Sequence, residues 1–349
     1  MAQGDLLPSE AVNSPDRSMR PRIGPDPLAW MVVIVVLALA SAQAWLGLGR
    51  DYLEYVDYYQ RIPPFFSFQD TRFEPGFHLI AWSFVNILNL PFWCFVFLIV
   101  GTALAIKAYL FRKYLNYPIA AMAVYLATFY PNQEYTQIRA ALAISLGMLA
   151  IHLFFERRFI WVAVASLAAF SFHYSIIILI VAFALAYVLR RNLLSVIIVA
   201  VMAILMVGAL ASGGGLNNIL INWFSTFNPL VGSYVDNVAA IDAASIWSVN
   251  NLIVIGMFFS AAAGGWLSKN FYQKCFTIMF GLSVTFVVLL SQAPIIAVRA
   301  KEMLLVSVVF AAFRLPLGRR DIIPISLVLA NATLLLFLAI REGVILSSS

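Results

Sequence analysis

Charged residues are scarce in this chain. Only 11% of its 349 residues are Asp, Glu, Lys or Arg, whereas a soluble domain carries about 25%. So few charges exclude an ordinary soluble globular protein. Between the charges, apolar runs of about 15–20 residues recur, which is the length that crosses a ~30 Å hydrocarbon core. We therefore predict a polytopic integral membrane protein.

The sequence also lacks the alternating apolar and polar pattern of a transmembrane barrel, so the predicted fold is all-α. We expect about 11–12 transmembrane helices in a single domain over 28–345. The apolar segments are 28–48, 73–90, 92–111, 118–130, 138–155, 159–171, 174–189, 193–210, 249–266, 275–291, 302–317 and 322–340. Residues 1–27 are polar and rich in Pro, so we expect a disordered cytoplasmic tail.

Cysteine and histidine are few. Cys94 and Cys275 lie in apolar runs without CxxC spacing, which argues against a disulfide framework. The three histidines show no metal-ligand spacing, so we expect no metal and no other cofactor. The net charge of +6 comes from Lys and Arg at the ends of predicted spans and gives no sign of nucleic-acid binding.

The positions of Lys and Arg predict the orientation. One side collects Lys107/Arg112/Lys113, Arg157/Arg158, Arg190/Arg191, Lys269/Lys274 and Arg314/Arg319/Arg320, and should be cytoplasmic. The extracytoplasmic loops are then about 49–74, 131–138 and 211–248. Arg17, Arg20 and Arg22 favour a cytoplasmic N-terminus, which agrees with these sides only if the polar segment 73–90 does not cross. We therefore prefer eleven spans and one helix that is re-entrant or interfacial.

The loop after the first apolar run reads "GRDYLEYVDYYQRIPPFFSFQDTRFEPGFH". If helical, it places Tyr52 and Tyr55 on one face and Asp51 on another. Two interpretations stay open. One is an interfacial helix with tyrosines at the headgroups. The other is an extracytoplasmic shelf whose carboxylates and aromatic rings bind sugars.

Two titratable residues are candidate bases. Glu74 precedes Pro75 at a predicted helix start, where capping alone would explain an acid. His173 lies in "SFHYS", where the uncharged stretch 159–189 is expected to break into two short helices. It is either a satisfied core residue or a group beside a water-filled cavity. Each could take a proton from a hydroxyl, as could Asp51.

Arg139 follows Gln137 at the start of an apolar run. There it lies at the unfavourable end of the helix dipole and close to hydrocarbon. The guanidinium either snorkels to the headgroups or binds an anion, since its fork of donors matches phosphate. Arg299, on the same predicted side, is a second candidate for that anion.

Three blocks, "RDYLEY…FEPGFHL", "QIRAALAISL" and "FHYSIIIL", resemble the EpsG-like membrane proteins of bacterial exopolysaccharide clusters over roughly 30–345. The chain departs from that pattern at Arg50 and Ala140, which bears on the substrate more than on the reaction. The resemblance implies a Wzy-like polymerase of the bacterial inner membrane. It is similar in outline to C-class glycosyltransferases, which have a juxtamembrane shelf after the first span.

That resemblance implies a glycosyltransferase whose donor is a glycan on polyprenyl diphosphate and whose acceptor is a hydroxyl of another lipid-linked unit. Its partners would be these lipid-linked oligosaccharides, membrane lipids and other export or chain-length proteins. Arg139, with Arg299, would stabilise the leaving diphosphate, while Gln137, Tyr52 and Tyr55 would contact substrate. The alternatives are a transporter or flippase of lipid-linked sugars and an accessory subunit of a synthase.

Overall fold

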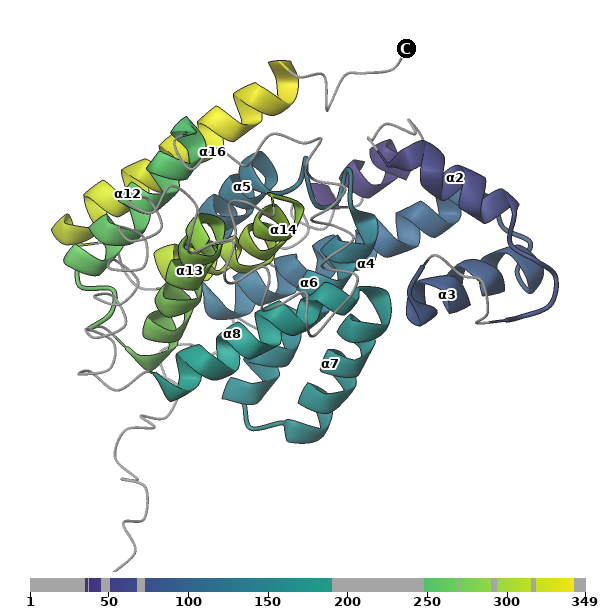
Figure 1. Ribbon diagram of the computed structural model, residues 1–349, viewed down its shortest axis with the longest axis horizontal. Helices are drawn as coiled ribbons and strands as arrows, with labels where there is room; N and C mark the ends of the chain where they lie inside the picture. The colour runs from purple at the N-terminus through teal and green to yellow at the C-terminus, as the bar shows by residue number, and fades with distance from the viewer. Residues whose placement is uncertain are drawn as a thin grey trace, which may run out of the picture.

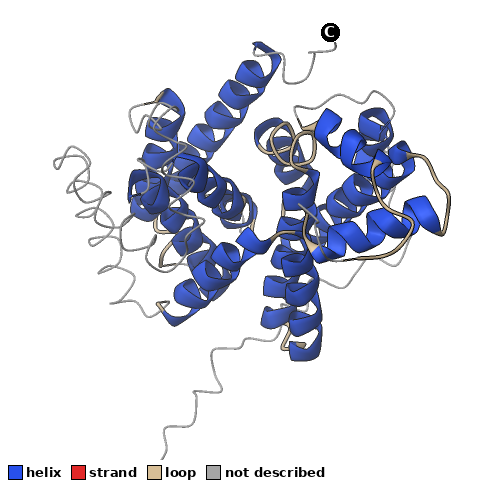
Figure 2. Ribbon diagram, turned by 45° about the vertical axis from the view of Figure 1, so that its right-hand side comes forward, coloured by secondary structure: helices blue, strands red, loops and turns tan. Residues whose placement is uncertain are grey.

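The computed structural model describes residues 35–36, 38–44, 51–67, 73–189, 248–268, 270–289, 294–314 and 318–341. Throughout these ranges the regular elements are helices and no strand occurs (Figure 2). The predicted tail 1–27, the span 193–210 and nearly all of the loop 211–248 lie outside the described residues.

Four described helices are long and apolar enough to cross a membrane. They are α4 (Phe92–Tyr114), α6 (Ile138–Phe155), α13 (Phe271–Leu289) and α16 (Ile322–Arg341). Their bounds agree closely with the apolar runs of the sequence. The prediction of an all-α polytopic membrane protein is therefore confirmed.

Shorter apolar helices pack between the long ones. They are α5 (Pro118–Thr128), α7 (Phe159–Phe172), α8 (Ile177–Val188) and α12 (Val249–Ala263). Helix α6 packs against α4 and α7, α13 packs against α8, and α12 lies beside α16 along one edge of the molecule (Figure 1). The bundle thus brings together helices that are far apart in the sequence.

Basic helix ends gather at one end of this bundle. The Lys113 ammonium pairs with Glu156, and the Arg314 guanidinium donates to the Tyr114 carbonyl. The Asn116 amide donates to the Phe313 carbonyl at 2.9 Å. These contacts join the ends of α4, α6 and α15 (Ser307–Phe313). The side of the membrane that this end faces stays a prediction.

The segment before α15 begins earlier than the sequence indicated. We expected an apolar segment over 302–317, but α14 (Pro294–Leu305) begins eight residues sooner and is separated from α15 by Val306. Arg299 and Lys301 precede the expected segment, and Glu302 is its first residue. The structure accommodates two of these charges inside protein, since Lys301 donates to Asn251 and Glu302 is hydrogen-bonded by a glutamine side chain.

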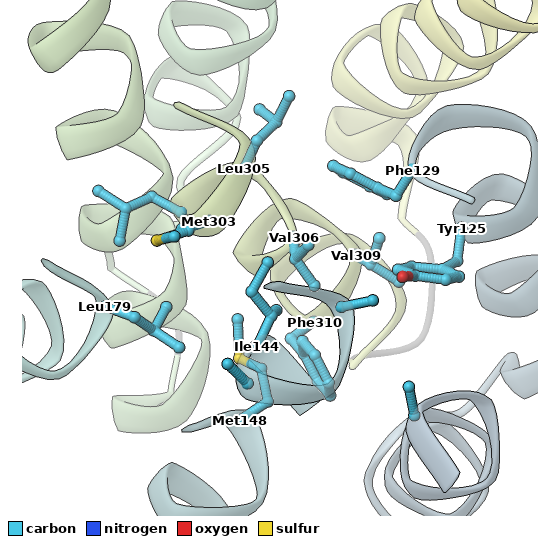
Figure 3. Close-up of a cluster of buried hydrophobic side chains, with 14 of the residues drawn as sticks. Tyr125, Phe129, Ile144, Met148, Leu179, Met303, Leu305, Val306, Val309 and Phe310 are labelled. Carbon is cyan, nitrogen blue, oxygen red and sulfur yellow. The ribbon is translucent and has the colours of Figure 1, made fainter. Parts of the chain in front are cut away.

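An apolar cluster fills the bundle where α14 meets α15. Figure 3 shows Val306 and Phe310 near Ile144 and Met148 of α6, and Val309 beside Tyr125 of α5. Each of these side chains is buried. Both halves of the broken helix pack against α13, and Phe310 also contacts His152 of α6, with ring centroids 4.8 Å apart.

The chain between α5 and α6 turns inside the bundle. Helix α5 has 11 residues, about 16 Å at 1.5 Å per residue, which is half of a ~30 Å core. The turn at 131–137 falls within the predicted extracytoplasmic loop 131–138, and its residues 133–136 are all buried. Irregular backbone at such a depth is tolerated when protein surrounds it.

Candidate functional site

A pair of short helices forms a shelf beside the bundle. Helix α2 (Tyr52–Gln60) and α3 (Pro75–Asn86) lie next to each other at one edge (Figure 1). The 12 residues of α3 span about 18 Å, which is too short to cross a membrane. This length agrees with the predicted non-crossing helix at 73–90 and with a juxtamembrane shelf.

Helix α3 contacts α7 closely through a glycine. A Cβ atom at Gly76 would lie 2.3 Å from the Ser171 hydroxyl and 2.9 Å from its carbonyl oxygen, so only glycine permits this approach. The contact brings the start of α3 next to the end of α7. It therefore carries Glu74 to His173, which lies 99 positions later in the chain.

Glu74 precedes α3, as predicted, but its carboxylate does not cap the helix. Its backbone is extended and its side chain makes no capping hydrogen bond. Instead, Oε1 lies 2.8 Å from His173 Nδ1, and Oε2 pairs with Arg139 Nη1. The view that capping explains Glu74 is therefore wrong, because two side chains from other helices hold its carboxylate.

Arg139 lies in the first turn of α6 and turns towards the shelf. Besides its ion pair, its Nε donates to the Tyr55 hydroxyl at 3.5 Å. The Arg139 Cζ atom stands 4.4 Å from the centroid of Phe73, within the range of a cation–π contact. The guanidinium is thus held by a carboxylate and aromatic rings of the shelf, which compensates its position at the positive end of α6.

His173 interrupts the helical path between α7 and α8. Its backbone is extended, and the short 3₁₀ turn η1 (Tyr174–Ile176) follows it. The predicted break at "SFHYS" is therefore confirmed. The ring is nearly buried, and its Nε2 atom has no hydrogen-bond partner although Nδ1 has one.

The electrostatics of this group, which we call the Glu74 cluster (Glu74, Arg139 and His173), favour an ionised carboxylate. Burial acts to raise the pKa of Glu74, but the hydrogen bond from His173 and the charge of Arg139 outweigh it and hold the pKa below its ordinary value. Burial raises the pKa of the neighbouring Tyr55, so its hydroxyl stays protonated. The exposed fractions are 22% for the Arg139 side chain, 9% for Glu74 and 11% for His173.

The other predicted site residues lie around this cluster. Asp51 precedes α2, and its charge reaches Tyr55. Tyr52 packs edge-on against Phe92 with ring centroids 5.3 Å apart. Of the predicted substrate contacts, Tyr55 therefore lies against the cluster, whereas Tyr52 lies against the start of α4.

Gln137 and Arg299 lie on the α14 side of the site. Gln137 ends the buried turn before α6, and its side chain bonds to the carboxylate of Glu302. Arg299 lies within electrostatic range of that carboxylate, one helical turn away on α14. Both residues are thus tied to Glu302 on α14, and a shared anion site for Arg139 and Arg299 stays a proposal.

Two charged residues that matter here, Lys107 and Glu134, were not among the candidate site residues of the sequence analysis. Lys107 was assigned to a cytoplasmic loop, which is wrong, because it lies inside α4 and is fully buried. Its ammonium pairs with Glu134 Oε1 at 2.6 Å, and we call these residues the Lys107 pair. It also donates to Ser145 Oγ at 2.6 Å and the Ala141 carbonyl at 3.1 Å. A lysine within an apolar run was the available signal.

The Glu74 cluster has the parts of a proton-transfer site. A carboxylate bonded to Nδ1 fixes the ring and its tautomer, which leaves Nε2 able to accept a proton. The adjacent guanidinium offers a charge that can stabilise a developing anion. Within the described residues, no three His, Cys, Asp or Glu side chains are placed to share a metal ion.

Comparison with known proteins identifies one related group. The model of the EpsG family matches residues 28–344, which is nearly the whole chain. No curated protein and no solved structure matches.

Proposed function

The chain belongs to the EpsG family, which is associated with polysaccharide polymerisation, and on that premise we propose that it is a Wzy-like polymerase of an exopolysaccharide. The donor is a glycan on polyprenyl diphosphate. The acceptor is a hydroxyl group of another lipid-linked unit. The reaction takes place on the outer face of the bacterial inner membrane, where the predicted orientation places the Glu74 cluster.

The observation that carries this proposal is the convergence of Glu74, Arg139 and His173 from three separate segments. In the proposed reaction the acceptor hydroxyl gives its proton to His173 Nε2 and its oxygen bonds to the anomeric carbon of the donor. The bond from that carbon to the diphosphate breaks. Glu74 holds the ring through Nδ1 and stabilises the imidazolium that forms. Among the candidate bases, His173 is favoured because its Nε2 atom is unpartnered.

Arg139 is assigned to the leaving group. The diphosphate gains charge as the glycosidic bond breaks, and a fixed guanidinium in a water-poor site stabilises that charge. Its bonds within the described residues use Nη1 and Nε. The remaining N–H groups of the guanidinium then bind phosphate oxygens, whose geometry matches its planar fork of donors.

Deletion of the gene tests the proposal in cells. Long polymer should disappear while lipid-linked single repeat units persist or accumulate. The purified full chain should then lengthen a lipid-linked oligosaccharide without any nucleotide sugar. Loss of the repeat unit itself would assign the protein to an earlier step. Movement of the lipid-linked sugar across a vesicle membrane, without lengthening, would identify a transporter.

A further inference from the structure

A cavity lies on the α14 side of the bundle, away from the Glu74 cluster. Its volume is about 330 Å³, at the lower end of the ~300–1,000 Å³ of small-molecule sites. It lies between the end of α5, the start of α12, and α14. Its polar lining includes Thr128, Asn250, Asn251, Lys301 and Glu302. A cavity of this size suits a compact polar group better than a polyprenyl chain.

Two buried polar atoms of this lining have no hydrogen-bond partner. Thr128 is only 6% exposed, yet its hydroxyl oxygen has no hydrogen-bond partner among the residues that the structure describes. The Oδ1 atom of Asn250 is likewise buried and unpartnered. Buried polar groups nearly always have a hydrogen-bond partner, and a buried group without one costs free energy. Both residues line the same cavity, so a small rotation of either side chain would offer its unpartnered atom to a ligand there.

The remaining groups indicate the chemistry of that ligand. Lys301 is buried and donates to Asn251 Oδ1 at 2.7 Å, while Glu302 contributes a carboxylate to the lining. Positive and negative groups therefore occur together with an amide and a hydroxyl. This mixture suits a ligand with many hydroxyl groups, each of which both donates and accepts. Phe129 adds an aromatic side chain to the lining.

The cavity is joined to the Glu74 cluster through the buried turn before α6. Gln133 lines the cavity and donates to the Glu302 carbonyl at 3.1 Å. Gln137 bonds to the Glu302 carboxylate and lies two residues before Arg139. One turn therefore contacts the cavity lining and leads directly into the start of α6, where Arg139 lies.

We propose that the cavity between α5, α12 and α14 binds a sugar residue of the glycan that the Glu74 cluster acts on. Thr128 and Asn250 make the hydrogen bonds that the protein leaves open, and Lys301 with Glu302 fixes the orientation of the ring. This inference rests on the proposed function for the identity of the glycan. The site itself rests on the cavity and its unpartnered atoms.

The test measures binding of the free repeat-unit oligosaccharide, released by mild acid from the lipid-linked intermediates of the producing strain. Full-length protein in lipid nanodiscs should bind it saturably. Thr128→Val keeps the side-chain shape and removes one hydrogen bond worth ~1 kcal/mol, so Kd should rise about five-fold. Asn250→Ala should weaken binding by at least about as much.

Thr285→Val is the matched control. Thr285 is buried on α13, and its hydroxyl donates to the Gly281 carbonyl of its own helix, outside the cavity lining. This variant should bind as wild type does. Thr128→Val should fold at least as well as wild type, because the hydroxyl it removes has no partner. Unchanged Kd for both Thr128→Val and Asn250→Ala, or no saturable binding by wild type, would overturn the inference.

Chain extension separates this inference from the proposed function. Thr128→Val should raise KM for the lipid-linked substrate by the same factor and leave kcat unchanged. If the oligosaccharide binds as predicted but no chain extension occurs, the cavity assignment stands and the polymerase proposal fails. If extension proceeds and neither variant changes KM or Kd, only the cavity assignment fails. Displacement of the oligosaccharide by inorganic phosphate alone would reassign the cavity to anions and also overturn it.

Discussion

The Glu74 cluster and the Lys107 pair differ in how completely their charges are satisfied. Lys107 is 1% exposed and Glu134 0%, and the ammonium has three acceptors for its three hydrogens. In the Glu74 cluster, the Arg139 side chain keeps 22% of its exposure and His173 Nε2 has no partner. Both groups are ionic and both involve α6, but only one has atoms left for a ligand.

The surroundings of Glu134 strengthen this contrast. Its carboxylate accepts hydrogen bonds from the Tyr125 hydroxyl at 2.7 Å as well as from Lys107, and its backbone carbonyl accepts from Gln43. These contacts tie the buried turn at 131–137 to three other segments. We infer that the Lys107 pair holds the turn in place, and that Arg139, which follows it, is positioned as a result.

The largest expected effect is on turnover. If His173 Nε2 is the general base, His173→Ala should lower the rate of chain extension by roughly 10²–10⁴-fold without loss of folded protein. The measurement is the initial rate on a defined lipid-linked substrate, per folded molecule. His152→Gln is the control, because His152 is buried between the Met148 carbonyl and the Tyr272 hydroxyl at the other end of α6. Near-normal extension by His173→Ala would move the base to Glu74 or Asp51.

The Lys107 pair should affect folding instead. Lys107→Met leaves the Glu134 carboxylate buried and unpaired by a cation, which costs about 3–5 kcal/mol of stability. The double variant Lys107→Met/Glu134→Gln removes that charge and should recover most of the folded protein. Yield of monodisperse protein and thermal unfolding measure this. A double variant that folds but does not extend chains would show that the Lys107 pair takes part in the reaction. The Lys107 pair and the Glu74 cluster would then no longer differ in role.

Arg139→Lys should have an intermediate effect on rate. If the guanidinium binds a diphosphate through two parallel hydrogen bonds, lysine keeps the charge but not the paired donors. This change should cost about 2–4 kcal/mol of transition-state stabilisation. Arg139→Ala should be nearly inactive, and both variants should fold. Arg158→Lys is the matched control, because that side chain is 61% exposed and pairs with Glu156. Wild-type rates for Arg139→Lys would make Arg139 a membrane anchor.

The smallest expected effect is the pH dependence of stability. The pKa of Glu74 is lower in the folded protein than its ordinary value of 4.5, so its partners stabilise the ionised form. That contribution is present above about pH 4.5 and is lost as pH falls through the folded pKa. The difference in Tm between wild type and Glu74→Gln should therefore persist from pH 7 to 5 and shrink below that. A difference that grows on acidification would contradict this account.

Sequence patterns predicted the helices better than their contacts. The lengths of the apolar runs and the positions of the charges predicted α6 and the break at His173, because both are local properties. The sequence also pointed to Glu74, Arg139 and His173 one by one. Their meeting depends on packing between segments that are 65 and 99 positions apart, including the close approach at Gly76, and no local signal records it.

The role of Lys107 was missed for a related reason. Charge counting treats every lysine near a helix end as a loop residue, which holds when the ammonium faces water. Here the ammonium is paired with Glu134 inside the protein. Glu134 lies within the bundle because α5 is short and the turn that follows it is buried. Thr128 and Asn250 were likewise unremarked, since an unsatisfied hydrogen bond is a property of the folded neighbourhood and not of a residue type.

The buried Lys107 pair also has a consequence for biogenesis. Translation delivers α4 to the membrane before Glu134, since the carboxylate follows Lys107 by 27 positions. A lysine at the centre of a lone helix costs about 2.5–3.5 kcal/mol on insertion. Helix α4 therefore avoids this cost if it stays beside the insertion machinery until the turn at 131–137 and α6 arrive. Release of these segments into lipid is then coupled, and Lys107→Leu should let α4 leave earlier in a cross-linking time course.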